Sequence, residues 1–169
     1  MRGVSVTEPT AGIMDSLTTR PAGAADIGWL TDVFLRSLRE PISVARGAWD
    51  EAREQLQFRE QLELGRTQVI QLRGADIGFL MSQERGDQVE LHTLCIAPEY
   101  QSQGIGTYIT RRLVSDAQTS GRNVVLSVLK ANERARKLYE RLGFVIVNES
   151  TYHHRMRLGD PADGGRDAR

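Results

Sequence analysis

The sequence predicts one α/β domain of the α+β kind, in which about four helices flank a mixed, mostly antiparallel central sheet of about seven strands. Short apolar, β-branched segments alternate with segments whose apolar residues recur every three or four positions, in the order β, α, α, β, β, β, α, β, α, β, β. Short glycine-containing turns join several strands, which is typical of antiparallel hairpins. The 169 residues suit one domain large enough to bury a core.

The first half of the chain contains a strand, two helices and two further strands. The expected elements are strand Ser16–Arg20, helix Ala24–Leu38, helix Trp49–Leu64, and strands Thr67–Leu72 and Ile77–Glu84. Pro41 is expected to end the first helix, because proline lacks an N–H donor and pushes the preceding residue out of the helical region. Gly65 ends the second helix. Residues Arg73–Asp76 form the hairpin turn between the two strands.

The second half alternates strands and helices before it closes on a hairpin. The expected elements are a strand from Val89 to Ala97, helix Ile105–Ala117, strand Val124–Leu129, a helix from Asn132 to Leu142, and strands Phe144–Val147 and Tyr152–Leu158. Pro98 ends the first of these strands, because proline cannot donate to a ladder. Asn132 is a good N-cap and Gly143 a good stop, so they delimit the last helix.

Composition is that of an ordinary globular protein. Lysine plus arginine and aspartate plus glutamate each number 22, so the charge balance suggests neither a nucleic-acid nor an acidic-membrane partner. A single cysteine allows no internal disulfide and fits a cytoplasmic location. No apolar run approaches the roughly 20 residues of a membrane span, and no signal peptide is visible. We expect flexible tails at residues 1–14 and 159–169 around a domain at residues 15–158.

A glycine-containing turn stands between the strand that ends at Ala97 and the next helix. Residues 101–107 read Gln-Ser-Gln-Gly-Ile-Gly-Thr. The first N–H groups of a helix are unsatisfied and carry partial positive charge, so they bind anions. Gly104 and Gly106 keep Cβ atoms away from a ligand phosphate. The turn lacks the Lys-Ser or Lys-Thr of nucleotide-hydrolase loops, and Ile109 stands where the dinucleotide fingerprint needs a small residue.

Two segments resemble the signatures of the GNAT superfamily, the acyl-CoA-dependent N-acetyltransferases. The first is Gln101-x-x-Gly104-x-Gly106, directly after the strand that ends in Ile-Ala-Pro. The second is Asn132 and a helix that ends in Leu-Tyr-Glu-Arg-Leu-Gly-Phe at Phe144. The two segments follow the family's order and spacing, and the resemblance covers roughly residues 15–158.

The resemblance implies a GNAT fold and the transfer of an acetyl group from acetyl-CoA to a primary amine of a small molecule or peptide, by direct attack. It places the coenzyme A site at Leu94, Cys95, Ile96, Gln101, Ser102, Gln103, Gly104, Ile105, Gly106, Thr107 and Asn132. Family members commonly carry glycine and arginine where this chain has Ser102 and Gln103. That departure makes cofactor binding more dependent on main-chain donors. The alternative is that Asn132 only caps the helix and does not contact the cofactor.

Tyr139 is the candidate general acid, because a tyrosine at this place in the family protonates the leaving thiolate. A phenol with a pKa of about 10 can supply a proton to a thiolate with a pKa near 8.5 when it is held close. The alternative is an amphipathic core tyrosine.

Glu90 and His92 are the candidate bases. Strand alternation puts them on one face with Leu94 and Ile96, and ionisable groups on a buried strand need a pocket, a partner or a strand end. Both positions match sites where some family members carry carboxylates, and His92 has the intrinsic pKa closer to neutral. The alternative for each is a polar strand residue held by its neighbours.

The segment from residue 37 to residue 58 is expected to form one wall of the acceptor groove, with Arg39, Glu40 and Trp49 as substrate-binding candidates. We expect no metal site, since histidine and cysteine are few and poorly spaced. The expected partner is an amine acceptor, and no nucleic-acid or membrane partner is expected. The chain is expected to be a monomer or a homodimer. The alternative function is a non-catalytic acyl-CoA sensor of the same fold.

Overall fold

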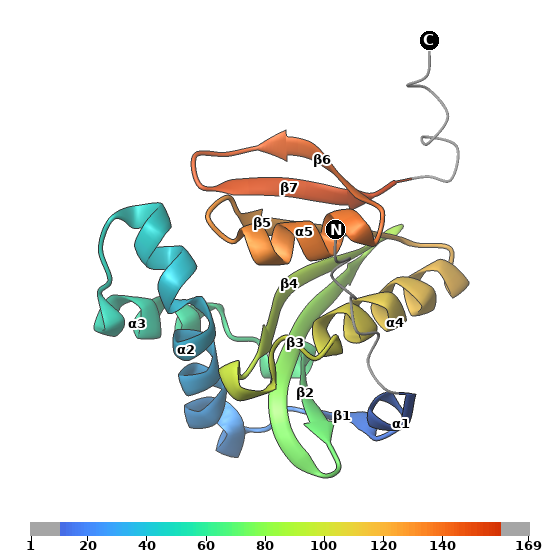
Figure 1. Cartoon of the computed structure of the whole chain (residues 1–169), viewed down its shortest axis with the longest axis horizontal. Helices are drawn as coiled ribbons and strands as arrows, with labels where there is room; N and C mark the ends of the chain where they lie inside the picture. Colours follow the sequence, from blue (N-terminus) through green and yellow to red (C-terminus); the bar gives the residue numbers. More distant parts are fainter. Residues whose placement is uncertain (1–10, 160–169) are drawn as a thin grey trace, which may run out of the picture.

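The computed structural model describes residues 11–159, whose arrangement is shown in Figure 1. The strands are β1 (Leu17–Pro21), β2 (Thr67–Leu72), β3 (Ala75–Arg85), β4 (Gln88–Ile96), β5 (Asn123–Leu129), β6 (Phe144–Glu149) and β7 (His153–Leu158). The helices are α1 (Ala11–Met14), α2 (Ile27–Arg46), α3 (Glu51–Gln61), α4 (Ile105–Thr119) and α5 (Glu133–Arg141), with 3-10 turns at Ala24–Asp26, Leu64–Arg66 and Pro98–Tyr100. The predicted fold class and the predicted order of strands are confirmed.

The seven strands form one sheet in the order β1-β2-β3-β4-β5-β7-β6. Five of the neighbouring pairs are antiparallel, and β4 and β5 are parallel. The pairing of β4 with β5 covers only Gln88–Leu91 and Asn123–Leu126. Beyond Leu91 the ladder between these two strands ends, so the middle of the sheet is open on that side.

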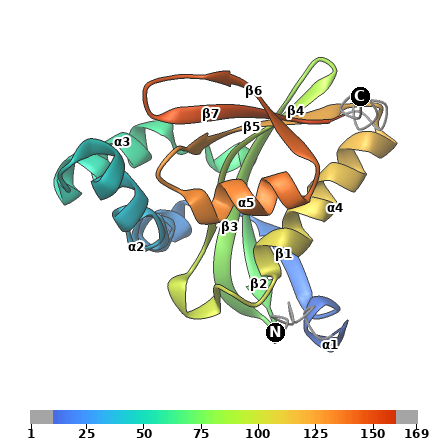
Figure 2. The same ribbon diagram turned by 45° about the horizontal axis from the view of Figure 1, so that its top comes forward.

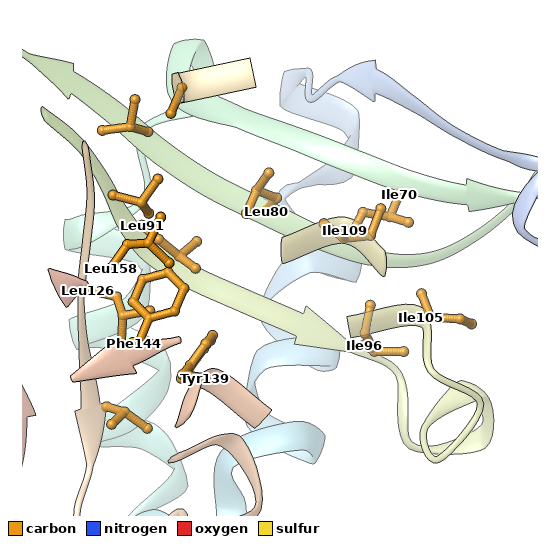
Figure 3. Packing of buried hydrophobic residues seen from close by; sticks show 14 of the residues in the cluster. Ile70, Leu80, Leu91, Ile96, Ile105, Ile109, Leu126, Tyr139, Phe144 and Leu158 are labelled. Carbon is orange, nitrogen blue, oxygen red and sulfur yellow. The ribbon is translucent and has the colours of Figure 1, made fainter. Parts of the chain in front are cut away.

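Two pairs of helices cover opposite faces of the sheet (Figure 2). Helices α4 and α5 pack on one face, where Ile105, Ile109 and Tyr139 lie in a core cluster with Leu91 and Leu126 (Figure 3). Helices α2 and α3 pack on the other face, and their buried residues join Val69, Phe79 and Cys95. The opening between β4 and β5 therefore lies between two separate helical layers.

Helix α2 runs through Pro41, contrary to the expectation that this proline would end it. Ile42 is buried in the turn that follows Pro41, and Arg46 forms an ion pair with the buried Glu54 of α3. These contacts hold the second half of α2 in place and outweigh the helix-breaking tendency of proline. Helix α2 ends at Gly47, which has a positive φ of 73°.

The N-terminal end of the described chain is also more ordered than expected. Ala11–Met14 forms the short helix α1, and Met14 is buried in the core cluster of the α4/α5 face. Placing residues up to 14 in a tail was therefore wrong for its last four residues. The rest of that tail and residues 160–169 lie outside the described residues.

A β-bulge in β4 corrects the predicted faces of that strand. Met81 of β3 lies opposite Thr93 whereas Ser82 lies opposite Leu91, so His92 is the extra residue. The bulge shifts the alternation by one residue, and Leu91 therefore shares the α4/α5 face with Ile96. Glu90 therefore does not share that face with Leu94 and Ile96, and His92 is exposed in the bulge itself. Strict strand alternation could not predict this, because it assumes a strand without bulges.

Within residues 11–159, the helices include none that combines the length and the apolar character required to cross a bilayer.

Candidate active site

The opening between β4 and β5 leads into a cavity of about 1150 Å³. The cavity is lined by the end of β4, by the glycine turn, by the start of α4, by α5 and by one side of α2. Residues 94–96, Tyr139, Asn132 and most of residues 101–107 therefore face a common space, as expected from the sequence. Gln103 lines no part of it.

The main chain of β4 carries unused hydrogen-bonding groups into this opening. The Ala97 N–H donates to the Ile77 carbonyl of β3 at 2.8 Å, and the register is regular from Thr93 to Ile96. Antiparallel residues alternate between bonding their neighbour and pointing away from it. Cys95 thus bonds β3, whereas Leu94 and Ile96 direct their N–H and C=O groups toward the gap beside β5.

The carbonyl of Ile96 is already occupied by two side chains. The Gln101 amide donates to it at 2.8 Å and the Ser37 hydroxyl donates to it at 3.1 Å. These bonds tie the glycine turn and helix α2 to the end of β4. The N–H of Ile96 and both main-chain groups of Leu94 remain for a ligand.

The glycine turn leads directly into α4. Gly104 is the N-cap, with a left-handed φ of 77° that suits glycine. Ser102 also has a positive φ, 63°, where a residue with a Cβ is uncommon. The Arg134 guanidinium, on α5, donates to the Gln101 Oε1 at 2.9 Å and to the Ser102 Oγ at 3.1 Å. The turn is therefore held from both sides, by β4 and by α5.

Asn132 acts as the predicted cap of α5. Its Oδ1 accepts a hydrogen bond from the Ala135 N–H at 3.1 Å, and the residue lines the cavity. The cap is confirmed by this bond, and a contact with cofactor stays a prediction.

Tyr139 combines burial with access to the cavity. It is 8% exposed, packs edge-on to Phe144 with ring centroids 5.7 Å apart, and lines the cavity. Burial, and secondarily the nearby Cys95, raises the pKa of the Tyr139 phenol well above its usual value. The phenol therefore stays protonated at neutral pH, as a general acid must. Burial likewise raises the pKa of the Cys95 thiol to about 12, so a thiolate is strongly basic in these surroundings.

Glu90 and His92 lie outside the cavity lining. The Arg155 guanidinium of β7 donates to the Glu90 carboxylate at 2.6 Å, which lowers the pKa of Glu90. Arg155 also donates to Ser127 at 3.3 Å, so Glu90 belongs to a polar cluster on the α2/α3 face. His92 sits in the bulge and is exposed.

Of the three acceptor candidates on or after α2, Glu40 lines the cavity and the other two do not. The Arg39 guanidinium lies 5.5 Å from the centroid of the Trp49 ring, in a cation–π contact. Ser37 and Pro41 also line the cavity. Because proline has no N–H, the Ser37 carbonyl receives no hydrogen bond from residue 41 and is left as an acceptor on this side of the helix.

The described residues include no group of three or more histidine, cysteine, aspartate or glutamate side chains arranged to hold a metal ion.

A family model described as "Acetyltransferase (GNAT) family" matches residues 33–144, which is more than half of the chain. The chain belongs to the GNAT family. The match contains the glycine turn, β4 and α5, which are the elements that build the cavity.

Curated GNAT relatives match this chain over part of their length. The chain is 33% identical over 84 residues to the 5-NmdU N-acetyltransferase of Pseudomonas phage PaMx11, which covers 48% of this chain and 59% of that protein. It is 32% identical over 96 residues to the ribosomal protein bS18-alanine N-acetyltransferase of Escherichia coli K12, which covers 56% of this chain and 62% of that protein. The matches span between 30% and 62% of the length of the curated relatives.

Solved GNAT structures share the fold. The PaiA N-acetyltransferase of Thermoplasma acidophilum, solved in complex with coenzyme A, superposes with a TM-score of 0.67 at 18% identity and covers 86% of this chain and 99% of that chain. At that identity the likeness concerns the fold alone.

Sequence reasoning missed several residues around this GNAT cavity. Ser37 and Pro41 lie in the segment expected to form the acceptor wall, but they were not singled out as site residues, because Pro41 was expected only to end the helix. Arg134 and Arg155 reach their partners through the tertiary fold, across 28 or more residues of sequence. The arginine that follows Asn132 and Glu133 in the second signature was visible, but nothing in its spacing indicated which turn it contacts.

Proposed function

We propose that this GNAT-family chain transfers an acetyl group from acetyl-CoA to a primary amine of a small molecule or peptide. The observation that carries the proposal is the opening beside β4, where the unused main-chain groups of Leu94 and Ile96 meet the glycine turn and Tyr139 in one cavity.

The residues present fit coenzyme A. An extended amide-bearing arm can add to the exposed edge of β4 as a strand would, through Leu94 and Ile96. The amides of residues 102–107, at the start of α4, suit a diphosphate. A ligand of this length needs a large cavity, and the volume of about 1150 Å³ provides it.

Bound acetyl-CoA supplies the acetyl thioester. One of the N–H groups left free on β4, that of Leu94 or that of Ile96, is proposed to donate to the carbonyl oxygen as negative charge develops on it. A C–N bond to the amine forms, the C–S bond breaks, and Tyr139 gives the proton of its hydroxyl to the departing sulfur. Burial keeps this phenol protonated, so the proton is in place when the C–S bond breaks. The proton lost by the amine restores the phenol through solvent.

The acceptor amine is proposed to approach from α2. The Ser37 carbonyl, which receives no bond from Pro41, and the Glu40 carboxylate are hydrogen-bond acceptors on that side of the cavity, and the N–H groups of an amine or ammonium can donate to them. Arg39 and Trp49 are proposed to act from the rim, by bracing the end of α2 through their cation–π contact.

Glu90 and His92 are proposed to accept the amine's proton only through water, because neither lines the cavity. The ion pair with Arg155 keeps Glu90 charged but lowers its basicity.

We further propose that the acceptor is the only partner class, with no nucleic acid or membrane, and that the protein acts in the cytoplasm as a monomer or homodimer. The balanced charge and the single, buried, free cysteine support this.

The test is a panel of primary amines, small molecules and peptides, incubated with acetyl-CoA while free thiol is measured. The expected result is acceptor-dependent thiol release. Tight binding of acetyl-CoA with no release for any amine would contradict the catalytic proposal and favour a non-catalytic sensor.

A further inference from the structure

The glycine turn contains no cation of its own. From Pro98 to Thr107 the chain has no lysine or arginine, and its one ionisable carboxylate, Glu99, forms an ion pair with Arg36. Neutral amides alone would therefore face a dianionic diphosphate bound at this turn. Charge-assisted hydrogen bonds are about twice as strong as neutral ones, so a cation from elsewhere would add considerably to binding.

Three arginines line the cavity, namely Arg111, Arg134 and Arg141. Arg134 is the one that donates to the turn, through its Nη1 to Gln101 and its Nη2 to Ser102. Both nitrogens of the guanidinium fork are thus aimed at the mouth of the turn. Neutral oxygens currently accept these bonds, and phosphate oxygens would accept them more strongly.

The position of Arg134 is unfavourable for its own helix. It is the second residue of α5, and a cation in the first turn of a helix opposes the positive end of the helix dipole. Its guanidinium is directed out of the helix, to a turn 32 residues earlier in the chain. A role in α5 therefore does not account for the residue, whereas a role at the turn does.

We propose that Arg134 supplies, from α5, the positive charge that the glycine turn lacks, and that it binds the diphosphate of coenzyme A. The inference rests on the proposed use of coenzyme A. Arg134 also positions Gln101, whose amide nitrogen is bonded to the Ile96 carbonyl, so it links the phosphate end of the cavity to the end of β4.

The test compares dissociation constants of the wild-type chain and Arg134→Gln for coenzyme A, dephospho-coenzyme A and pantetheine. Loss of a charge-assisted pair predicts binding of the first two weakened at least about tenfold. Pantetheine, which has no diphosphate, should bind both proteins equally. Arg112→Gln, an exposed arginine of α4 that does not line the cavity, is the matched control and should bind all three as wild type does.

Restoring a cation to the turn provides an independent check. Gln103→Arg, added to Arg134→Gln, is expected to recover most of the lost affinity for coenzyme A without changing pantetheine binding. A purely structural role for Arg134 would instead weaken all three ligands, and the added arginine would not rescue them.

The outcomes separate this inference from the proposed function. A wild-type chain that binds no coenzyme A would overturn both. Equal affinity of wild type and Arg134→Gln for coenzyme A would overturn the role of Arg134 alone. An effect seen with coenzyme A but absent with dephospho-coenzyme A would also overturn it, because the arginine would then contact the 3′-phosphate.

Discussion

At the scale of single residues, Tyr139 shows how burial keeps a phenol protonated beside a cavity. The ring is fixed by packing against Phe144, and desolvation raises the pKa of the phenol. That Tyr139 lies on the inner face of a helix could be predicted, because a helical face and a C-terminal glycine are local features, whereas its role as the general acid stays a prediction. The faces of Glu90 and His92 could not be predicted, because the bulge that moves them arises from pairing with β3.

Tyr139→Phe is expected to lower kcat at least about a hundredfold, which is the usual cost of losing a general acid. The dissociation constant for coenzyme A should change less than about twofold, and the melting temperature should stay close to that of wild type, because ring packing is retained. Steady-state thiol release and thermal unfolding measure these quantities. An unchanged kcat across the pH range would remove Tyr139 from the mechanism.

Glu90→Gln and His92→Ala separate the two candidate bases. A water-mediated role predicts a loss of kcat of about tenfold or less for the residue involved, with a shift of the rising limb of the pH–rate profile for that variant alone. If both profiles coincide with that of wild type, neither side chain takes the proton and solvent receives it directly.

At the scale of elements, α2 illustrates a helix whose continuation is decided by tertiary contacts. Local rules indicate a break at Pro41, and they were wrong because Ile42 and Arg46 are anchored beyond it. The end of β2, the hairpin turn with positive φ at Arg73 and Gly74, and the cap at Asn132 were predictable because each depends on nearby residues.

Pro41→Ala should restore the hydrogen bond to the Ser37 carbonyl. The helix penalty of proline is about 3 kcal/mol and its effect on the unfolded chain offsets about 1 kcal/mol, so the free energy of unfolding should rise by about 2 kcal/mol. The KM for the acceptor should rise because an acceptor group in the cavity is lost, with the affinity for coenzyme A unchanged. Denaturant titration and steady-state kinetics test this, and a stabilised variant with an unaltered acceptor KM would argue against the α2 site.

At the scale of the whole molecule, the chain brings distant segments together with a few ionic contacts. Arg20 at the end of β1 donates to Asp26 before α2 at 2.8 Å and to Asp76 near the β2–β3 turn at 2.7 Å. The bond from Arg20, followed by a bond from the Gly23 N–H, lowers the pKa of Asp26 from 3.8 to about 2. The order of strands was predictable from the sequence, whereas this network and the separation of β4 from β5 were not, because they depend on which segments meet.

Because of Asp26, we expect the free energy of unfolding to fall over a defined range of acidic pH. Its pKa is lower in the folded than in the unfolded chain, so its contribution is complete above pH 3.8 and is lost as the pH falls toward about 2. Asp26→Asn should lower the free energy of unfolding at neutral pH by about 1 kcal/mol, after allowance for solvent screening. Urea titrations at several pH values should show the difference from wild type shrinking over that range, and a difference independent of pH would contradict the assignment.

The central claim is that the opened edge of β4 and the glycine turn together hold acetyl-CoA. Equilibrium dialysis of the wild-type chain against labelled acetyl-CoA tests this most directly. The account predicts saturable binding of one molecule per chain, abolished by Gly104→Val, since a β-branched residue is strained at the positive φ that shapes the turn. Absence of saturable uptake by the folded wild-type chain would contradict it.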